Sequence, residues 1–288
     1  MALLSLQQIH KTFEKGTVNE NHVLRGLDLD IEQGDFISVI GGNGAGKSTL
    51  MNSIAGVLSI DEGDILLDGQ SIKKASVDER SKDISRVFQD PRMGTATNLS
   101  IEENMAIAYR RGKKRSFFKK SITESERQIF KEALVDLGLG LENRMKTDAN
   151  FLSGGQRQAL TLAMATLVRP KILLLDEHTA ALDPKTSDMV MNLTRKIVEE
   201  QKLTTLMITH NMEHAIEYGN RLVMLYHGKI VVDVQGEKRK TSLLQSLWPS
   251  STKIVDKFSM TMPWYSVNIL EKKSYPKFRF WIVFLDYF

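Results

Sequence analysis

Residues 41–49 read Gly41-Gly42-Asn43-Gly44-Ala45-Gly46-Lys47-Ser48-Thr49. They satisfy G-x-x-x-x-G-K-[ST], in which glycines let successive backbone N–H groups converge on phosphate oxygens. The apolar run at 36–40 predicts a strand buried on both faces, and residues 48–57 have the apolar spacing of a helix. Strand, glycine loop and helix in this order predict a phosphate-binding loop. Lys47 would supply charge to the β- and γ-phosphates, and the Ser48 hydroxyl would bind Mg²⁺.

A second motif ends on two carboxylates. Residues 172–175 are Ile-Leu-Leu-Leu, followed by Asp176 and Glu177. Four apolar residues predict a buried strand, and ligands of open α/β sheets bind at the carboxyl ends of strands. Asp176 is therefore placed to hold Mg²⁺ and Glu177 to polarise an attacking water. The two motifs together predict a P-loop nucleoside triphosphatase.

A third motif, Leu152-Ser153-Gly154-Gly155-Gln156, predicts another helix N-terminus that binds an anion. With this stretch the chain resembles the ATP-binding cassette (ABC) family, whose signature is LSGGQ. The resemblance covers about residues 3–240. Further family elements follow in order: the adenine-stacking aromatic Phe13, the Q-loop Gln89, the D-loop Ala181-Leu182-Asp183 and the switch histidine His210.

The resemblance implies a composite site, with ATP held between the phosphate loop of one copy and the signature of another. It implies a head-to-tail dimer with a second copy or a paralogue. Catalytic roles are implied for Lys47, Gln89, Glu177 and His210. Mg²⁺ ligation is implied for Ser48, Gln89 and Asp176. The set implied to bind ATP is Phe13, Gly41, Gly42, Asn43, Gly44, Ala45, Gly46, Lys47, Ser48, Thr49, Ser153, Gly154, Gly155, Gln156 and Asp183.

The resemblance further implies an ATP-hydrolysing subunit that energises solute import through a separate integral membrane permease. The stretch from His178 to Lys185, HTAALDPK, is similar to bacterial import ATPases of the amino-acid type, tryptophan-type systems among them. His178 itself either contacts the site or caps the turn. An extracytoplasmic solute-binding protein is expected in the same system. We expect a cytoplasmic protein, peripheral on the inner face of the membrane.

The alternative is a soluble ABC ATPase that acts on ribosomes or nucleic acid without a permease. Such proteins usually carry two cassettes or long coiled-coil insertions, and this chain has neither. The net charge is +4, from 39 basic and 35 acidic residues, and seven of the basic residues lie between Arg110 and Lys120. This local patch is not the globally basic surface of a nucleic-acid binder. The basic patch is either a solvated loop, a surface that contacts anionic lipid headgroups or a permease loop, or a nucleic-acid-binding segment.

Alternating strands and helices predict an α/β fold. We expect a P-loop NTPase core with a mostly parallel sheet, an N-terminal antiparallel β part and a helical signature subdomain at about residues 91–160. Together these would form a nucleotide-binding domain over 1–240. Residues 241–288 hold 11 of the chain's 21 aromatic residues and form a tail of unknown role. Three interpretations of the tail stay open. It is a small C-terminal addition that packs on the core, a surface on which a partner docks, or a sequence that is not under the same functional constraint as the rest, such as an altered reading frame.

The composition excludes several kinds of chemistry. The chain has no cysteine, which excludes disulfides, cysteine zinc sites and thiol catalysis. No apolar run approaches the ~18–20 residues that span a bilayer. The first residues show neither a basic region nor a long apolar region of a secretory signal. We therefore expect the chain to stay inside the cell.

Overall fold

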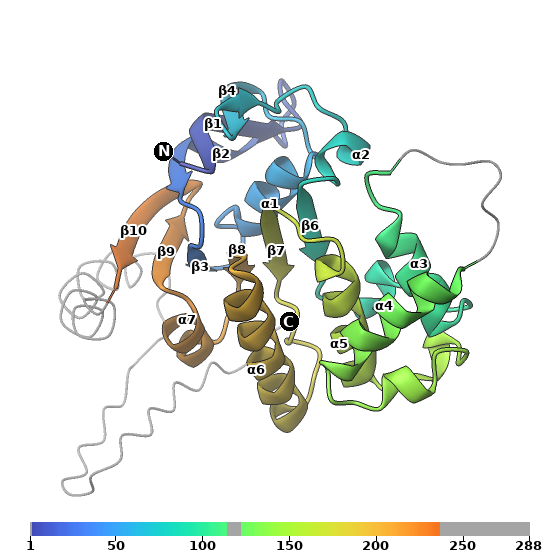
Figure 1. The fold of residues 1–288 in the computed structure, drawn as a ribbon. Helices are drawn as coiled ribbons and strands as arrows, with labels where there is room; N and C mark the ends of the chain where they lie inside the picture. Colours follow the sequence, from blue (N-terminus) through green and yellow to red (C-terminus); the bar gives the residue numbers. More distant parts are fainter. Residues whose placement is uncertain (1, 114–121, 237–288) are drawn as a thin grey trace, which may run out of the picture. The chain divides into compact units, whose positions relative to one another are not determined.

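The computed structural model describes residues 2–113 and 122–236, and the account below concerns these residues (Figure 1). The aromatic-rich tail and most of the basic patch lie outside them. The described part of the chain forms two sheets and a set of helices (Figure 1).

The first sheet is antiparallel and comes mainly from the N-terminal residues. Its spatial order is β2-β1-β4-β5. The strands are β1 (Leu4–Phe13), β2 (Asn21–Ile31), β4 (Glu62–Leu67) and β5 (Gln70–Ser71). β1 pairs antiparallel with both β2 and β4. The N-terminal antiparallel part predicted from the sequence is therefore confirmed.

The second sheet has the order β10-β9-β3-β8-β7-β6. Its strands are β3 (Phe36–Ile40), β6 (Ile84–Val87), β7 (Ile172–Asp176), β8 (Thr204–Ile208), β9 (Arg221–Tyr226) and β10 (Lys229–Gln235). All neighbours pair in parallel except β9 and β10. Every residue of β3 and β8 is buried, as expected for central strands covered on both faces.

Apart from the first one, the α-helices of the described residues begin next to residues whose side chains cap them. α1 (Lys47–Ala55) follows the glycine loop, and α2 (Val77–Arg80) is a single turn. The others are α3 (Ile101–Tyr109), α4 (Glu124–Val135), α5 (Gly154–Thr166), α6 (Pro184–Gln201) and α7 (Met212–Tyr218). Short 3₁₀ turns lie at Pro91–Gly94, Leu141–Asn143 and Ala149–Phe151. α3, α4 and α5 lie together at one side of the parallel sheet (Figure 1).

Two of these helices are longer at the N-terminus than apolar spacing alone indicates. That spacing marks residues 128–137 and 160–168, but α4 begins at Glu124 and α5 at Gly154. In both cases a capping box provides the earlier start, at Thr123 and at Ser153. In the sequence, Asp183 followed by Pro184 predicts the start of a helix. This prediction is confirmed, because Asp183 caps α6 by accepting a hydrogen bond from the Thr186 backbone and Pro184 occupies the first turn.

The core has two parts, one on each face of the parallel sheet. Leu173 and Leu175 of β7 pack with the helices α3 to α6, whereas Leu174 packs with α1 and the antiparallel sheet. This alternation follows from the twofold side-chain period of a strand. The sheet is thereby fixed from both sides, which holds the loops at its carboxyl edge in place.

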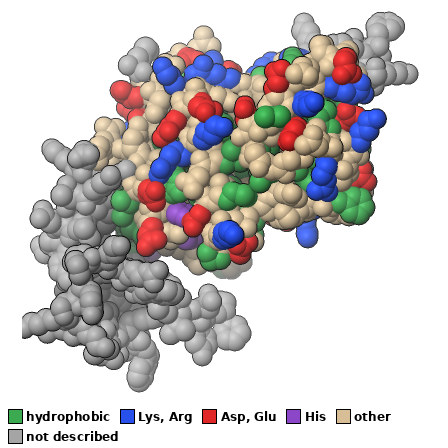
Figure 2. All heavy atoms as spheres, turned by 60° about the horizontal axis from the view of Figure 1, so that its bottom comes forward, with side chains coloured by type: hydrophobic (Ala, Val, Ile, Leu, Met, Phe, Trp, Pro, Cys, Tyr) green, Lys and Arg blue, Asp and Glu red, His purple; other side chains and the backbone are tan. Residues whose placement is uncertain are grey.

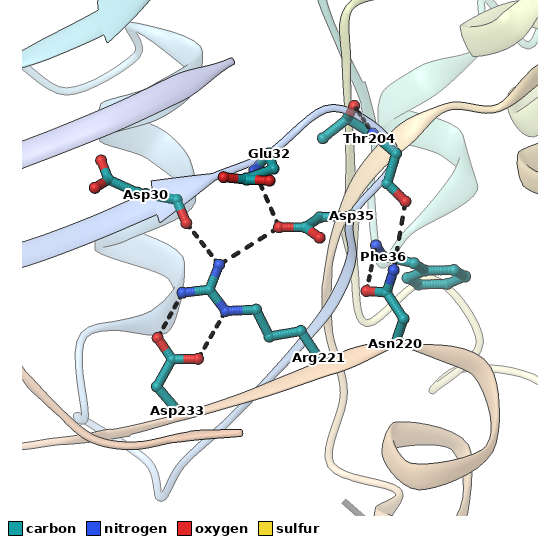
Figure 3. A network of polar contacts seen from close by, with 9 residues as sticks. Asp30, Glu32, Asp35, Phe36, Thr204, Asn220, Arg221 and Asp233 are labelled. Atoms are coloured by element: carbon teal, nitrogen blue, oxygen red, sulfur yellow. Dashed lines mark hydrogen bonds and ion pairs between the residues drawn. The ribbon is translucent and has the colours of Figure 1, made fainter. Parts of the chain in front are cut away.

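A polar network closes the opposite, amino edge of the parallel sheet (Figure 3). Arg221 donates to Asp233 through Nε at 2.7 Å and Nη2 at 2.5 Å, and to the Asp30 carbonyl through Nη1 at 2.6 Å. The Phe36 backbone donates to Asn220 at 2.9 Å. The network therefore joins the ends of β2, β3, β9 and β10.

The surface is mixed in charge. Lys and Arg side chains intermingle with Asp and Glu across the face seen in Figure 2, and apolar side chains form small groups between them. Among the helices of the described residues, none is long and apolar enough to cross a bilayer.

Candidate nucleotide-binding and catalytic site

The sequence motifs meet at one edge of the parallel sheet. Strands β3, β8, β7 and β6 are consecutive neighbours and run in the same direction. Their carboxyl ends lead into the glycine loop, His210, the pair Asp176–Glu177 and Gln89, in that spatial order. Residues as much as 169 positions apart in the chain therefore line one edge, where ligands of open α/β sheets bind.

The glycine loop has a backbone that only glycine adopts freely. Gly41, Gly44 and Gly46 have φ of 153°, 73° and 104°. A Cβ at Gly41 would lie 2.4 Å from the Leu225 carbonyl oxygen. The loop ends at α1, whose N-terminus has no side-chain cap. The curled backbone and an uncapped helix start match the requirements for binding phosphate.

Lys47 lies inside this loop. It is buried, and its Nζ donates to the carbonyls of Gly41 at 2.7 Å and Gly42 at 3.1 Å. Burial lowers the pKa of Lys47, while the nearby charges of Glu177 and Asp176 act in the opposite direction. The ammonium group is thus within electrostatic reach of both carboxylates at this edge.

Asp176 is paired with an arginine that the sequence reasoning did not single out. Arg86 of β6 places Nη2 2.5 Å from Asp176 Oδ2, and its Nη1 donates to Asn52 Oδ1 at 2.6 Å. Its guanidinium also lies over the Phe88 ring, 4.8 Å from the centroid. The available signal in the sequence was a charged residue within a short strand that also holds Ile84 and Val87.

Glu177 and His210 contact each other directly. Nε2 of His210 lies 2.7 Å from Oε1 of Glu177, and the Glu177 side chain is 15% exposed. Glu177 has φ of 46°, a left-handed conformation that is unusual for a residue with a side chain. Its backbone N–H donates to the Ile208 carbonyl of β8 at 3.1 Å. This backbone contact ties Glu177 to the end of β8, directly before the loop that holds His210.

Gln89 and Asp176 line a shared cleft of about 730 Å³. Gly154 at the start of α5 and Leu182 also line it. The cleft therefore connects the edge of the parallel sheet with the signature and D-loop segments. Gln89 is exposed there, within reach of anything that enters from outside.

The signature segment forms the start of α5. Ser153 and Gln156 cap each other, with backbone-to-side-chain distances of 3.2 Å in both directions. Gly155 is buried against α6, and a Cβ there would lie 2.3 Å from Thr186 Cγ2. Asp183 accepts from the Thr186 backbone at 3.1 Å, and hydrogen bonds from Thr186 lower the Asp183 pKa. The signature and the D-loop are thus packed side by side.

Phe13 lies at the end of β1 in the antiparallel sheet and is half-buried. The Lys11 Nζ is 5.7 Å from the centroid of its ring. Its stacking on adenine stays a prediction, as do the roles assigned above from the motifs.

Two histidines next to this site are buried. His178 is 2% exposed and lies 3.0 Å from Thr194 Oγ1 through its Nε2. Burial lowers its pKa to about 4, with a smaller contribution from His214. From the sequence alone, His214 is expected to be a surface residue of a helix, and this expectation is wrong. His214 is 7% exposed, because its ring packs on Tyr218 and faces Asp188 of α6.

The described part of the basic patch also differs from a wholly solvated loop. The Arg111 guanidinium donates to the carbonyl of Ala165 at 3.1 Å and to that of Val168. It thereby satisfies carbonyl groups at the C-terminal end of α5 and the turn after it. At least this residue of the patch has a structural role.

The donors at this edge fit Mg²⁺. In the described residues, no cluster of three or more His, Cys, Asp or Glu side chains could hold a metal ion alone. Mg²⁺ is typically bound by one or two protein oxygens together with substrate phosphates. The exposed Ser48 and the Asp176 carboxylate supply oxygens of this type next to the phosphate loop.

The comparisons with known proteins agree with this geometry. The family model described as ABC transporter matches residues 24–180. The tyrosine transport ATP-binding protein of Clostridioides difficile is 42% identical over 245 residues, 85% of this chain and 97% of the relative. The phosphonates import ATP-binding protein PhnC of Lactobacillus gasseri is 35% identical over 246 residues, 83% of this chain and 90% of the relative.

Among solved structures, a dimeric ATP-binding cassette in a post-hydrolysis state, bound to ADP and Pi, has a TM-score of 0.69 and 29% identity. The match covers 81% of this chain and 98% of that one. The chain belongs to the ABC transporter family. It is an ATP-binding, ATP-hydrolysing subunit of a membrane-associated transporter, and the fold class predicted from the sequence is confirmed.

Proposed function

We propose that this chain binds MgATP, pairs head to tail with a second cassette, and couples ATP hydrolysis to solute import through a separate permease. One observation carries the proposal. Four adjacent parallel strands bring the phosphate loop, His210, Asp176–Glu177 and Gln89 to one edge. No single motif would require this convergence, and it joins phosphate binding to a carboxylate that can act on water.

Each residue at this edge has a role that its position supports. The loop amides and Lys47 bind the phosphates, and Ser48, Gln89 and Asp176 hold Mg²⁺, which neutralises phosphate charge. Glu177 accepts a proton of the attacking water, and His210 keeps that carboxylate oriented.

The second half of the site comes from the partner cassette. Ser153, Gly154 and Asp183 are exposed, so they are accessible to ATP bound on a facing copy. ATP bridges the two copies, and hydrolysis removes the γ-phosphate that both contact. ATP-driven closing and opening of the dimer would then move a permease that contacts the cleft near Gln89.

An imported solute of the amino-acid type is supported by the relatives. The match covers 97% of the tyrosine transport ATP-binding protein, and the other relative named above is also an import ATP-binding protein. Import also requires a solute-binding protein on the outer side, and places this chain at the cytoplasmic face. We assign residues 1–240 to the nucleotide-binding domain, with a helical subdomain at about 91–160 and a separate tail at 241–288.

The test of catalysis is Glu177→Gln, which keeps the side chain's shape but removes its ability to accept a proton as a base. Turnover is expected to fall at least about 100-fold, with ATP affinity retained. ATP should also trap a dimer, seen by light scattering. Glu213→Gln is the matched control, because Glu213 is exposed in the first turn of α7. Undiminished turnover in Glu177→Gln would contradict the mechanism.

The test of transport uses the Glu177→Gln chain as bait. Purified from detergent-solubilised membranes in ATP, it should bring a polytopic membrane protein with it. Recovery of ribosomes or nucleic acid without a membrane protein would favour the soluble alternative. In the recovered complex reconstituted in liposomes with its binding protein, tyrosine should stimulate ATP hydrolysis. Stimulation by a phosphonate and not by tyrosine would overturn the proposed solute class.

A further inference from the structure

Two buried histidines, His178 and His214, lie close in sequence to Glu177 and His210. His178 directly follows Glu177, and His214 lies four residues after His210. Both are bound to helix α6. His178 Nε2 is 3.0 Å from Thr194 Oγ1, and His214 Nε2 is 3.5 Å from Asp188 Oδ1. Helix α6 is therefore connected to the residue that follows Glu177 and to helix α7, which follows His210.

The direction of the His178 hydrogen bond follows from the proton inventory. The Thr194 hydroxyl has one proton, which it donates to the Val190 carbonyl at 2.8 Å. Thr194 Oγ1 is thus the acceptor toward His178, so Nε2 of the imidazole carries the proton. The bond is fully buried, with His178 2% exposed and Thr194 0%. Water does not compete for either partner.

The conformation of Glu177 needs such support. Its φ of 46° is left-handed, and a residue with a side chain keeps that conformation only where its surroundings fix it. On one side, the Glu177 N–H is bound to Ile208. On the other side, the next residue is held in the core by Thr194. Loss of the second attachment would free the peptide that sets the direction of the Glu177 carboxylate.

We propose that the buried His178–Thr194 hydrogen bond positions Glu177 for ATP hydrolysis by locking its backbone to helix α6. His178 is a positioning residue, since its side chain is buried against α6 and acts on Glu177 only through the backbone. The inference rests on the proposed role of Glu177. It adds that α6, whose N-cap Asp183 lies on the face proposed to meet the partner cassette, orients the Glu177 carboxylate through His178.

The experiment compares three threonine variants of the full-length chain. Thr194→Val removes the hydroxyl at nearly constant shape, and Thr194→Ser keeps it. Thr166→Val is the matched control: Thr166 is also buried in a helix and also donates to the carbonyl four residues earlier, at 2.9 Å, on α5. kcat, KM for ATP and the thermal midpoint are measured for each.

Thr194→Val is expected to lower kcat roughly tenfold with KM for ATP within about twofold, because a small displacement of a catalytic group costs rate and not ground-state binding. Thr194→Ser should recover kcat to within about twofold, and Thr166→Val should keep it. His178→Ala should match Thr194→Val, and the double variant should be no slower than either single one.

Several outcomes would overturn the inference. One is wild-type kcat in a folded Thr194→Val chain, and another is an equal loss in Thr166→Val. A third is a fall in ATP affinity that matches the fall in kcat. If His178→Ala does not fold, the Thr194→Val and Thr194→Ser pair still decides. If Glu177→Gln proves fully active, the proposed function fails; if Glu177→Gln is inactive but Thr194→Val is not, only this inference fails.

Discussion

Arg86 Nη2 lies 2.5 Å from Asp176 Oδ2, so one oxygen of the carboxylate proposed to hold Mg²⁺ is already paired with a cation. The two residues come from neighbouring parallel strands, β6 and β7. Both side chains are mostly buried, 13% and 15% exposed. Arg86 therefore competes electrostatically with any cation that Asp176 binds. Its positive charge offsets the negative charge of Asp176, which the motifs alone do not indicate.

Replacing Arg86 by Gln is expected to lower the Mg²⁺ concentration that half-saturates binding of a fluorescent ATP analogue, by about fivefold, because a repulsive positive charge is removed. Arg86→Lys keeps the charge and should stay near the wild-type value. A higher Mg²⁺ requirement in Arg86→Gln would show instead that Arg86 mainly orients Asp176.

Gly155→Ala tests the contact between the signature and α6. The new methyl would lie 2.3 Å from Thr186 Cγ2, so stability to urea should fall by roughly 1–3 kcal/mol. Adding Thr186→Ser removes the opposing methyl and should restore stability. ATP hydrolysis should recover together with stability in the double variant, because Gly155 is buried and the added methyl points at α6. Restored stability without restored hydrolysis would show that Gly155 also has a role toward the partner's ATP.

The parts of the fold that the sequence predicted well are those with strong local signals. The five apolar residues before the glycine loop form a buried strand, and Asp183 with Pro184 begins α6. The convergence of motifs was also predictable, since parallel strands place their carboxyl ends at one edge. Helix starts were less well predicted, because the capping boxes at Thr123 and Ser153 extend α4 and α5 beyond their apolar spacing.

The partners of single polar side chains could not be predicted. Arg86 reaches Asp176 only because β6 and β7 are neighbours, although 90 residues separate the two in sequence. His178 meets Thr194, and His214 meets Asp188, only because α6 packs against the segment after β7 and against α7. Such pairings depend on how strands and helices pack against one another, and the periodicity of the sequence does not reveal this.

The Asp183 cap is expected to make stability depend on pH. Hydrogen bonds from Thr186 lower its pKa in the folded chain, so the unfolded chain binds more protons at acidic pH. Its contribution is present above the unfolded pKa of about 4 and is lost as pH falls through the lower folded value. The wild-type advantage over Asp183→Asn in urea should therefore shrink between about pH 5 and pH 3. A constant difference would contradict this, and Asp183→Ala should be less stable than Asp183→Asn throughout.

Arg221→Met tests the network at the amino edge of the sheet. The change leaves Asp233 and Asp35 without their shared cation, and it removes the donor to the Asp30 carbonyl. Breaking a buried ion pair costs about 3–5 kcal/mol, but Asp233 is 36% exposed, so we expect a loss of about 2–3 kcal/mol in urea unfolding. Arg195→Met is the control, because its pair with Glu217 lies on the surface and should contribute less than about 1 kcal/mol. Equal losses in the two variants would mean that the network adds nothing beyond an ordinary surface pair.

Because the network is at the edge opposite the phosphate loop, the affinity of folded Arg221→Met for ATP should match that of the wild type.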